Sequence, residues 1–186
     1  RLTGCPLRCQ YCDTAYAFTG GKALSVDAVL DRVAELSASQ VCVTGGEPLA
    51  QPACIALLTR LCDAGYAVSL ETSGALDTSK VDARVSVVLD LKTPASGEAH
   101  RNLWDNVKRL RPHDQVKFVV CDRADFEWAV AAVERENLLS RCTVLVSPSY
   151  EQVQPQELAG WVLKSGLNLR LQLQLHKLLW GDRPGV

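Results

Sequence analysis

The chain has 186 residues, 47% of them hydrophobic, a formal net charge of −1 and a sequence pI of about 6.3. This length suits one globular domain with a substantial core. The near-neutral charge gives no basic footprint for a nucleic-acid partner, and no apolar run is long enough to predict a membrane span.

Three of the eight cysteines crowd near the start of the chain, at Cys5, Cys9 and Cys12. The others are scattered through apolar stretches, at Cys42, Cys54, Cys62, Cys121 and Cys142. A disulfide-stapled secreted domain would be smaller and richer in loops. We therefore interpret the chain as a cytoplasmic protein in which the scattered cysteines are small buried hydrophobes.

After the cysteine triplet, helical and strand patterns alternate. Apolar residues at helical spacing predict helices at Val26–Ser37, Pro52–Ala64, Trp104–Arg111, Ala124–Glu136 and Gln156–Lys164. Short apolar runs predict strands at Gln40–Thr44, Tyr66–Leu70, Val85–Leu91, Gln115–Val120, Thr143–Ser147 and Asn168–Leu173, and Arg1–Gly4 is interpreted as the tail of a further strand. This alternation is typical of βαβ units and a mostly parallel sheet. A closed eightfold barrel needs about 250 residues. We therefore predict an α/β fold, an open partial (β/α)6-type barrel in a single domain over 1–186.

Polar and glycine-containing loops follow four of the predicted strands. They are Thr44-Gly45-Gly46-Glu47-Pro48, Glu71-Thr72-Ser73-Gly74, Asp90-Leu91-Lys92-Thr93-Pro94 and Ser147-Pro148-Ser149-Tyr150. Each has an ordinary structural interpretation, such as a tight turn, a helix cap or a solvated lysine. Because ligands bind at the carboxyl ends of parallel strands, we expect all four loops to face one mouth.

The cysteine triplet has the spacing C-x3-C-x2-C. Structural zinc sites and electron-transfer 4Fe–4S clusters usually take four protein ligands. Three cysteines would leave one iron of a cluster open to a substrate or cofactor. A zinc site or an ordinary cluster completed by a distant Cys or His is the alternative at this point.

This spacing, with Tyr11 directly before the last cysteine, resembles the motif of the radical S-adenosylmethionine (SAM) superfamily. The resemblance implies a radical SAM core, a 4Fe–4S cluster on Cys5, Cys9 and Cys12, and SAM as the second cofactor. The glycines of the Thr44–Pro48 loop permit a close backbone approach to a ligand. In the superfamily, this loop holds the amino group of SAM.

A narrower set of motifs resembles the 7-carboxy-7-deazaguanine synthase family over essentially the whole chain. These motifs are Arg1-x-x-Gly4-Cys5, Cys12-Asp13-Thr14, the first three polar loops and Leu175-His176-Lys177-x-x-Trp180-Gly181. The resemblance implies a radical lyase that converts 6-carboxy-5,6,7,8-tetrahydropterin into 7-carboxy-7-deazaguanine with loss of ammonia, in queuosine and deazapurine biosynthesis. It also implies Mg²⁺, a flavodoxin- or ferredoxin-like reductant and a homodimer.

Site residues follow from the same resemblance, position by position, and none of them is a catalytic side chain. The metal ligands are Cys5, Cys9 and Cys12 for iron and Thr14 for Mg²⁺, and the substrate contacts are Arg1 and Thr44. The SAM contacts are Tyr11, Cys12, Asp13, Gly46, Asp90, Leu91, Lys92, Ser147, Pro148, Ser149 and Tyr150. His176 is a weaker candidate for a place near the substrate.

Two departures from the family pattern are visible. The family carries a first strand and a substrate-binding loop upstream of the position of Arg1, and we expect both to be missing from this chain. The tail from Trp180 to Val186 matches no substrate contact.

Two other functions compete with this interpretation. One is another short radical SAM enzyme, such as a glycyl-radical activase, which would act on a large protein partner. The other is a non-enzymatic iron–sulfur electron carrier, which would need a fourth cysteine ligand from among the scattered five.

Overall fold

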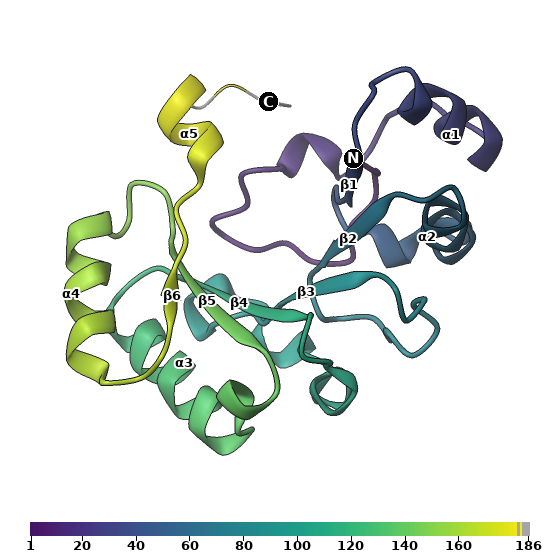
Figure 1. Cartoon of the computed structure of the whole chain (residues 1–186). Coiled ribbons are helices and arrows are strands. Elements are labelled where there is room, and N and C mark those ends of the chain that lie inside the picture. Colours follow the sequence, from purple (N-terminus) through teal and green to yellow (C-terminus); the bar gives the residue numbers. More distant parts are fainter. Residues whose placement is uncertain (182, 184–186) are drawn as a thin grey trace.

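The protein is built around a parallel sheet of six strands, seen here in a computed structural model that describes residues 1–181 and 183. The strands are β1 (Gln40–Val43), β2 (Ala67–Thr72), β3 (Ser86–Asp90), β4 (Gln115–Val120), β5 (Thr143–Pro148) and β6 (Arg170–Leu171). They are paired in chain order, and every neighbouring pair is parallel. Strands β1 and β6 are the two edges, and the sheet between them is curved (Figure 1). The predicted open, partial barrel is confirmed.

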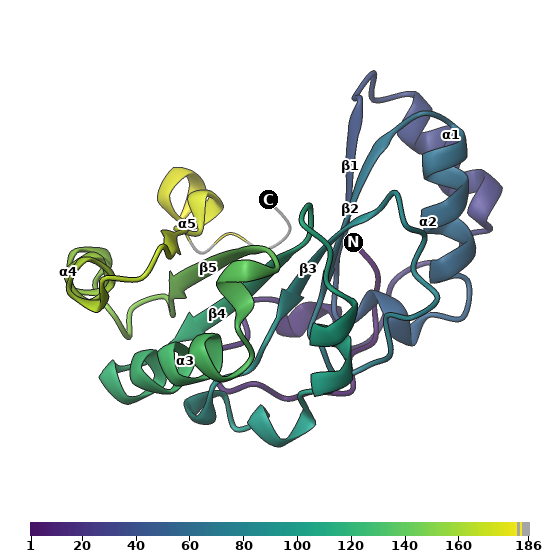
Figure 2. The same ribbon diagram turned by 60° about the horizontal axis from the view of Figure 1, so that its bottom comes forward.

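Of the five α-helices in the described residues, four cover the outer face of this sheet, and α5 lies on the other side (Figure 2). The α-helices are α1 (Val26–Ala34), α2 (Cys54–Asp63), α3 (Arg123–Arg135), α4 (Pro155–Ser165) and α5 (Leu175–Trp180). Short 3-10 helices connect them, at η1 (Ala15–Ala17), η2 (Pro48–Ala50), η3 (Pro94–Ser96), η4 (Ala99–Arg101), η5 (Trp104–Arg109) and η6 (Leu138–Ser140). Helices α1 and α2 lie beside β1 and β2, α3 and α4 lie beside β4 to β6, and α5 lies across the sheet from α3 (Figure 2).

The helix boundaries follow from local chemistry. The Ser25 hydroxyl accepts a hydrogen bond from the Ala28 amide at 3.2 Å and caps α1. The Asp122 carboxylate accepts one from the Asp125 amide at 2.8 Å and caps α3. Helix α4 ends at Gly166, whose φ of 68° is the left-handed conformation that glycine adopts without strain. These caps explain why the predicted helices begin and end close to the observed ones.

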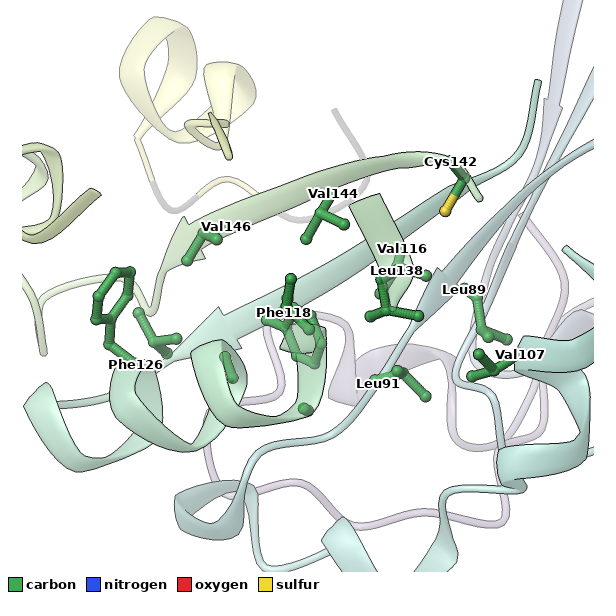
Figure 3. Packing of buried hydrophobic residues seen from close by; sticks show 14 of the residues in the cluster. Leu89, Leu91, Val107, Val116, Phe118, Phe126, Leu138, Cys142, Val144 and Val146 are labelled. Atoms are coloured by element: carbon green, nitrogen blue, oxygen red, sulfur yellow. The ribbon is translucent and has the colours of Figure 1, made fainter. Parts of the chain in front are cut away.

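The main core lies between the outer face of the sheet and helices α3 and α4. On β4, Val116, Phe118 and Val120 are fully buried and point outward, while the intervening Lys117 and Val119 line a cavity on the inner side. Phe118 lies in one cluster with Val144 and Val146 of β5 and with Leu91, which follows β3 (Figure 3). A second cluster packs α2 against β1 and β2. The alternation of buried and cavity-lining residues therefore separates a core face from a ligand face.

Three predictions of local structure need correction. The segment predicted as a helix at Trp104–Arg111 is the 3-10 helix η5. The side-chain amide of Asn106 donates hydrogen bonds to the carbonyl oxygens of Gly74 and Leu76, which connects η5 to the loop after β2. The last strand spans only two residues, Arg170 and Leu171, which pair with Leu145 and Val146 of β5. Residues Leu175–Trp180 form α5, which the sequence analysis did not predict.

The Arg1–Gly4 segment joins the sheet only through a single parallel bridge between Leu2 and Gly45. Among the described residues, no helix combines the length and the apolar character needed to cross a membrane.

Candidate active site

A cavity of about 540 Å³ opens at the carboxyl ends of the strands. Its walls are the cysteine loop, the ends of β1 to β5 and the segment that leads into α5. The predicted site residues in its lining are Arg1, Cys5, Cys9, Tyr11, Cys12, Asp13, Thr14, Thr44, Gly46, Asp90, Lys92, Ser147, Ser149, Tyr150 and His176. The expected convergence of the four polar loops on one mouth agrees with this lining.

Two predicted contact residues lie elsewhere. The Leu91 side chain is fully buried in the apolar core of the outer face, because it follows Asp90 and so points to the opposite side. Pro148 is the last residue of β5 and is buried beside Val120. Any contact that these two residues make with a ligand in the cavity would come from their backbone atoms.

The cysteine loop is held in shape by its own backbone and by Arg8. The Arg8 guanidinium donates to the carbonyl oxygens of Cys5 at 2.8 Å and Leu7 at 2.7 Å, and it lies 4.2 Å from the centre of the Phe18 ring. The Cys12 amide donates to the Cys9 carbonyl at 3.2 Å. These contacts order the loop without using the thiols of Cys9 and Cys12, while the Cys5 sulfur accepts a hydrogen bond from the Leu7 amide at 3.5 Å.

The three free thiols suit a cluster that takes three protein ligands. Cys5, Cys9 and Cys12 are all half-buried in the cavity wall, and none forms a disulfide. Within residues 1–181 and 183, no three His, Cys, Asp or Glu side chains are grouped tightly enough to hold one metal ion. A 4Fe–4S cluster is larger and distributes its thiolate ligands over several irons. The donor set and the size of the cavity fit such a cluster.

A nearby cation influences two of these thiols. Burial raises the pKa of the Cys9 thiol to about 11, and the Lys92 ammonium acts in the opposite direction. Burial also raises the pKa of the Cys5 thiol, and Lys92 again lowers it. Thiolates are the form that binds iron, so this cation favours the binding form of both side chains.

The Gly45-Gly46 loop makes close contact with the N-terminal segment. A Cβ atom on Gly45 would lie 1.9 Å from the Leu2 carbonyl oxygen, and one on Gly46 would lie 2.3 Å from the Gly4 carbonyl oxygen. The Leu2 amide donates to the Thr44 carbonyl at 2.7 Å, and the Gly46 amide donates to the Leu2 carbonyl at 2.9 Å. The close backbone approach that was predicted for a ligand is therefore made by the Leu2–Gly4 backbone of the chain itself.

Glu47 is fully buried and joins two of the polar loops. Its carboxylate accepts hydrogen bonds from the Thr72 hydroxyl at 2.9 Å and from the Ser73 amide and hydroxyl at 2.7 and 2.5 Å. It also accepts one from the Leu49 amide at 3.0 Å. A buried carboxylate needs such donors to offset the loss of water. Glu47 therefore fixes the loop after β1 to the end of β2.

Four charged side chains alternate in sign along the base of the cavity. The Lys92 ammonium lies 3.0 Å from one oxygen of Asp90, and the Lys117 ammonium lies 3.4 Å from the other. Lys117 also lies 3.8 Å from a Glu71 oxygen. Asp90 and Lys117 are register partners on the adjacent strands β3 and β4. The parallel pairing of the strands thus builds this charge row.

Each charge in this row favours the ionised form of its neighbours. Burial acts to raise the pKa of Asp90, but the two ammonium groups outweigh it and hold that pKa below its usual value. Burial acts to lower the pKa of Lys92 and of Lys117, and the carboxylate of Asp90 outweighs it in both cases. All three groups therefore stay ionised inside the protein.

The mouth of the cavity is closed on one side by the segment before α5. The Gln174 amide donates to an Asp13 oxygen at 2.6 Å, and the His176 imidazole lies 3.8 Å from the same oxygen. The Arg1 guanidinium donates to the hydroxyl of Thr14, the residue after Asp13, at 3.2 Å. These contacts bring the two ends of the described chain together over the cysteine loop.

Several lining residues were missed by the sequence analysis. Lys117 is the most informative, because a lysine inside the apolar run of β4 occupies the inward position of the strand alternation. That position is a signal that the sequence does carry. Two further lining residues are Gln172, which lies inside the predicted strand Asn168–Leu173, and Gln174, which follows it. The tail predicted to match no substrate contact lies partly outside the described residues, which omit 182 and 184–186.

Comparisons with known proteins give matches across the chain. The family model of the radical SAM superfamily matches residues 1–95. The 7-carboxy-7-deazaguanine synthase of Chlorobaculum tepidum is 40% identical over 190 residues, which cover 100% of this chain and 86% of that relative. The protein of the same name from Koribacter versatilis is also 40% identical, and its match covers 97% of this chain and 86% of the relative.

Solved structures show the same fold at much lower identity. Streptococcus suis SuiB bound to its precursor peptide SuiA superposes with a TM-score of 0.65 at 14% identity, over 93% of this chain. The structure of SuiB bound to S-adenosylmethionine gives a TM-score of 0.62 at 13% identity. This chain spans 47% and 45% of the length of those two chains, respectively. At this identity, the likeness is one of fold alone.

Proposed function

Because the chain belongs to the radical SAM superfamily and, within it, to the 7-carboxy-7-deazaguanine synthase family, we propose that it converts 6-carboxy-5,6,7,8-tetrahydropterin into 7-carboxy-7-deazaguanine with loss of ammonia. The observation that carries the proposal is the arrangement of three free thiols in the wall of a cavity formed by the carboxyl ends of the strands. Such an enzyme is a radical carbon–nitrogen lyase.

In this proposal, Cys5, Cys9 and Cys12 hold a 4Fe–4S cluster. When bound, the cluster and SAM together supply a 5′-deoxyadenosyl radical, which is the chemistry that the protein itself lacks. The three thiols leave one iron without a protein ligand, as SAM binding requires. The remaining side chains bind, orient and shield the reactants.

The SAM cradle is formed by the cysteine loop and the ends of β1, β3 and β5. Its members are Tyr11, Asp13, Gly46, Asp90, Lys92, Ser147, Ser149 and Tyr150, with backbone atoms of Leu91 and Pro148. Ser147 and Ser149 are buried at the end of β5, where they offer short polar side chains to a bound ligand. Tyr11 lines the cavity, and its hydroxyl, which is buried from solvent, has no hydrogen-bond partner among the described residues.

The substrate half of the cavity lies near the N-terminal residue. Arg1 suits a bidentate contact with the substrate carboxylate, and its guanidinium is already held beside Thr14 at 3.2 Å. The Thr14 hydroxyl donates a hydrogen bond to the Asp13 carboxylate at 2.8 Å, so two oxygen atoms lie side by side. Hard oxygen ligands of this kind suit Mg²⁺. Thr44, at the end of β1, contacts the pterin in this arrangement.

In this proposal, the segment before α5 covers one side of the cavity. Gln174 links it to Asp13, and the Lys177 ammonium lies 4.9 Å from the centre of the Tyr150 ring. His176 sits between these two links, 3.8 Å from Asp13. In this proposal, His176 lies near the substrate side of the mouth.

We also propose a flavodoxin- or ferredoxin-like reductant, a homodimer and a cytoplasmic location. The reductant follows from the electron that the cluster needs. Helix α5 exposes Leu175, Leu178, Leu179 and Trp180, and an apolar face of this kind suits a second copy of the chain. The eight free cysteines suit a reducing compartment.

The proposal is tested by anaerobic turnover. The protein is reconstituted with iron and sulfide, reduced with dithionite, and supplied with SAM, Mg²⁺ and 6-carboxytetrahydropterin, and liquid chromatography follows both products. We expect 7-carboxy-7-deazaguanine in the wild type and a raised KM for the pterin in Arg1→Lys, because lysine cannot make the bidentate contact. SAM cleavage without deazaguanine would contradict the substrate assignment.

A further inference from the structure

The buried charges at the base of the cavity do not cancel. Asp90 contributes one negative charge, while Lys92 and Lys117, on either side of it, contribute two positive charges. The side chains of Asp90, Lys92 and Lys117 are 14%, 10% and 17% exposed, respectively. Glu71 is farther from Lys117, at 3.8 Å, and is 44% exposed, so water screens its charge. The buried trio therefore carries a net charge of about +1.

A buried excess charge is costly unless an opposite charge lies close to it. After Asp90, the Cys9 thiol is the acidic group that most raises the pKa of Lys92. Lys92 lies 5.7 Å from the centre of the Tyr11 ring, and Tyr11 stands between Cys9 and Cys12 in the loop. Lys92, Lys117 and all three cysteines line the same cavity. The excess positive charge thus faces the cysteine loop.

A 4Fe–4S cluster on three thiolates supplies the missing anion. In its oxidised form, it carries one net negative charge, and it gains a second when it takes up an electron. Local charge and solvent exposure are among the main determinants of a cluster's reduction potential. A buried cation next to the cluster favours the more negative, reduced form.

We propose that the trio Lys92–Asp90–Lys117 sets the reduction potential of the cluster, with Lys92 and Lys117 raising it and Asp90 lowering it. The inference rests on the proposed function only in requiring a cluster on Cys5, Cys9 and Cys12. The redox step is the transfer of one electron from a low-potential reductant to the cluster. Lys92 has the larger effect because it lies nearer the cysteine loop, and Lys117 acts mainly by balancing Asp90.

The trio also has a purely structural interpretation. The structural and the electrostatic interpretations predict different signs for the shifts in reduction potential. If the three side chains only supported the loop, every substitution would disturb the cluster in the same way. If they act through charge, Lys92→Met and Asp90→Asn shift the potential in opposite directions. The double variant Asp90→Asn/Lys92→Met removes one charge of each sign, so its potential lies between those of the two single variants.

The test is a redox titration of the reconstituted protein without substrate, in which electron paramagnetic resonance measures the reduced cluster. For Lys92→Met, we expect the ratio of reduced to oxidised cluster at a fixed potential to fall about tenfold, which is about 59 mV for one electron. Lys117→Met shifts the ratio in the same direction by less, and Asp90→Asn raises it. Lys164→Met, at an exposed position on α4, is the matched control and leaves the potential unchanged.

Iron and sulfide content and the melting temperature are measured for every variant. Lys92→Arg and Lys117→Arg keep the positive charge, so the reduction potentials of these two variants should stay close to that of the wild type. If a methionine variant fails to fold, the arginine variants are compared with Asp90→Asn instead. Equal potentials, or shifts of one sign in all variants with intact clusters, would overturn the inference. Sign-opposed shifts in a protein that forms no deazaguanine would refute the proposed function and leave this inference standing.

Discussion

The two faces of the parallel sheet are made from the same strands and differ completely in chemistry. On β4, Val116, Phe118 and Val120 fill the outer core, while Lys117 between them faces the cavity and approaches Asp90 of β3. The outer face gains stability by removing apolar surface from water. The inner face buries less apolar surface, because it holds charged side chains in fixed positions beside the cavity.

This contrast shows where stability and function are separated in the molecule. Substitutions on the outer face should change the free energy of unfolding and affect activity only through folding. Substitutions on the inner face should change ligand binding or redox properties with a smaller change in stability. The following predictions test this separation in order of decreasing effect.

The largest effect is expected at the cysteine loop. Cys9→Ser removes one of three thiolates, so we expect the cluster content to collapse and SAM cleavage to fall to background. Cys62→Ser, on the outer helix α2, makes the same chemical change away from the cavity and should leave both unchanged. Iron and sulfide analysis and a 5′-deoxyadenosine assay measure the two quantities. Equal losses of cluster and of SAM cleavage in the two variants would contradict the assignment of the cluster to the cysteine loop.

The next effect is on stability and lies on the outer face. Phe118→Ala leaves a cavity beneath α3 and should lower the free energy of unfolding by about 3–5 kcal/mol. Denaturant titration measures this loss. Leu163→Ala on α4 removes a leucine that is 83% exposed and should change stability by less than about 0.5 kcal/mol. A Phe118 variant as stable as the Leu163 variant would show that the outer core is not where the stability resides.

An intermediate effect is expected at Glu47, which joins the loop after β1 to the end of β2. Glu47→Gln places an amide group among the donors from Thr72, Ser73 and Leu49, so it should cost about 1–3 kcal/mol and raise the KM for SAM. Glu127→Gln on the exposed side of α3 is the matched control. A variant with wild-type stability and KM would argue that this buried carboxylate does not hold the two loops together.

The smallest effect is expected for an ion pair outside both faces. Arg60 of α2 and Asp27 of α1 form a salt bridge between exposed side chains. Such pairs are worth less than about 1 kcal/mol, so Arg60→Ala should leave activity unchanged and alter stability only slightly. A loss as large as that of Phe118→Ala, measured in the same titration, would mean that the contact between α1 and α2 carries part of the core.

The outer face was largely predictable from the sequence. Helix α3 was predicted at Ala124–Glu136 and is observed at Arg123–Arg135, because local spacing and the Asp122 cap determine it. Helix α5 was missed. Its leucines and Trp180 are exposed, so it has none of the amphipathic pattern that marks a helix packed on the sheet.

The inner face was only partly predictable. Motif spacing identified the cysteines and polar loops, which depend on local sequence. The pairing of Asp90 with Lys117 depends on the register of β3 and β4, and these two residues are far apart in the chain. The same holds for the bonds from Glu47 to Thr72 and Ser73. Such contacts are set by tertiary structure, and no local pattern in the sequence reports them.

The central claim is that three thiols hold a cluster with one iron open to SAM. Its most direct test is electron paramagnetic resonance of the reduced, fully loaded protein before and after addition of SAM labelled with ¹⁷O in its carboxylate. We expect the cluster signal to change and to acquire a hyperfine coupling to the labelled oxygen. A fully loaded cluster whose spectrum is unaltered by saturating SAM would contradict the account, because it would mean that a fourth protein ligand closes the site.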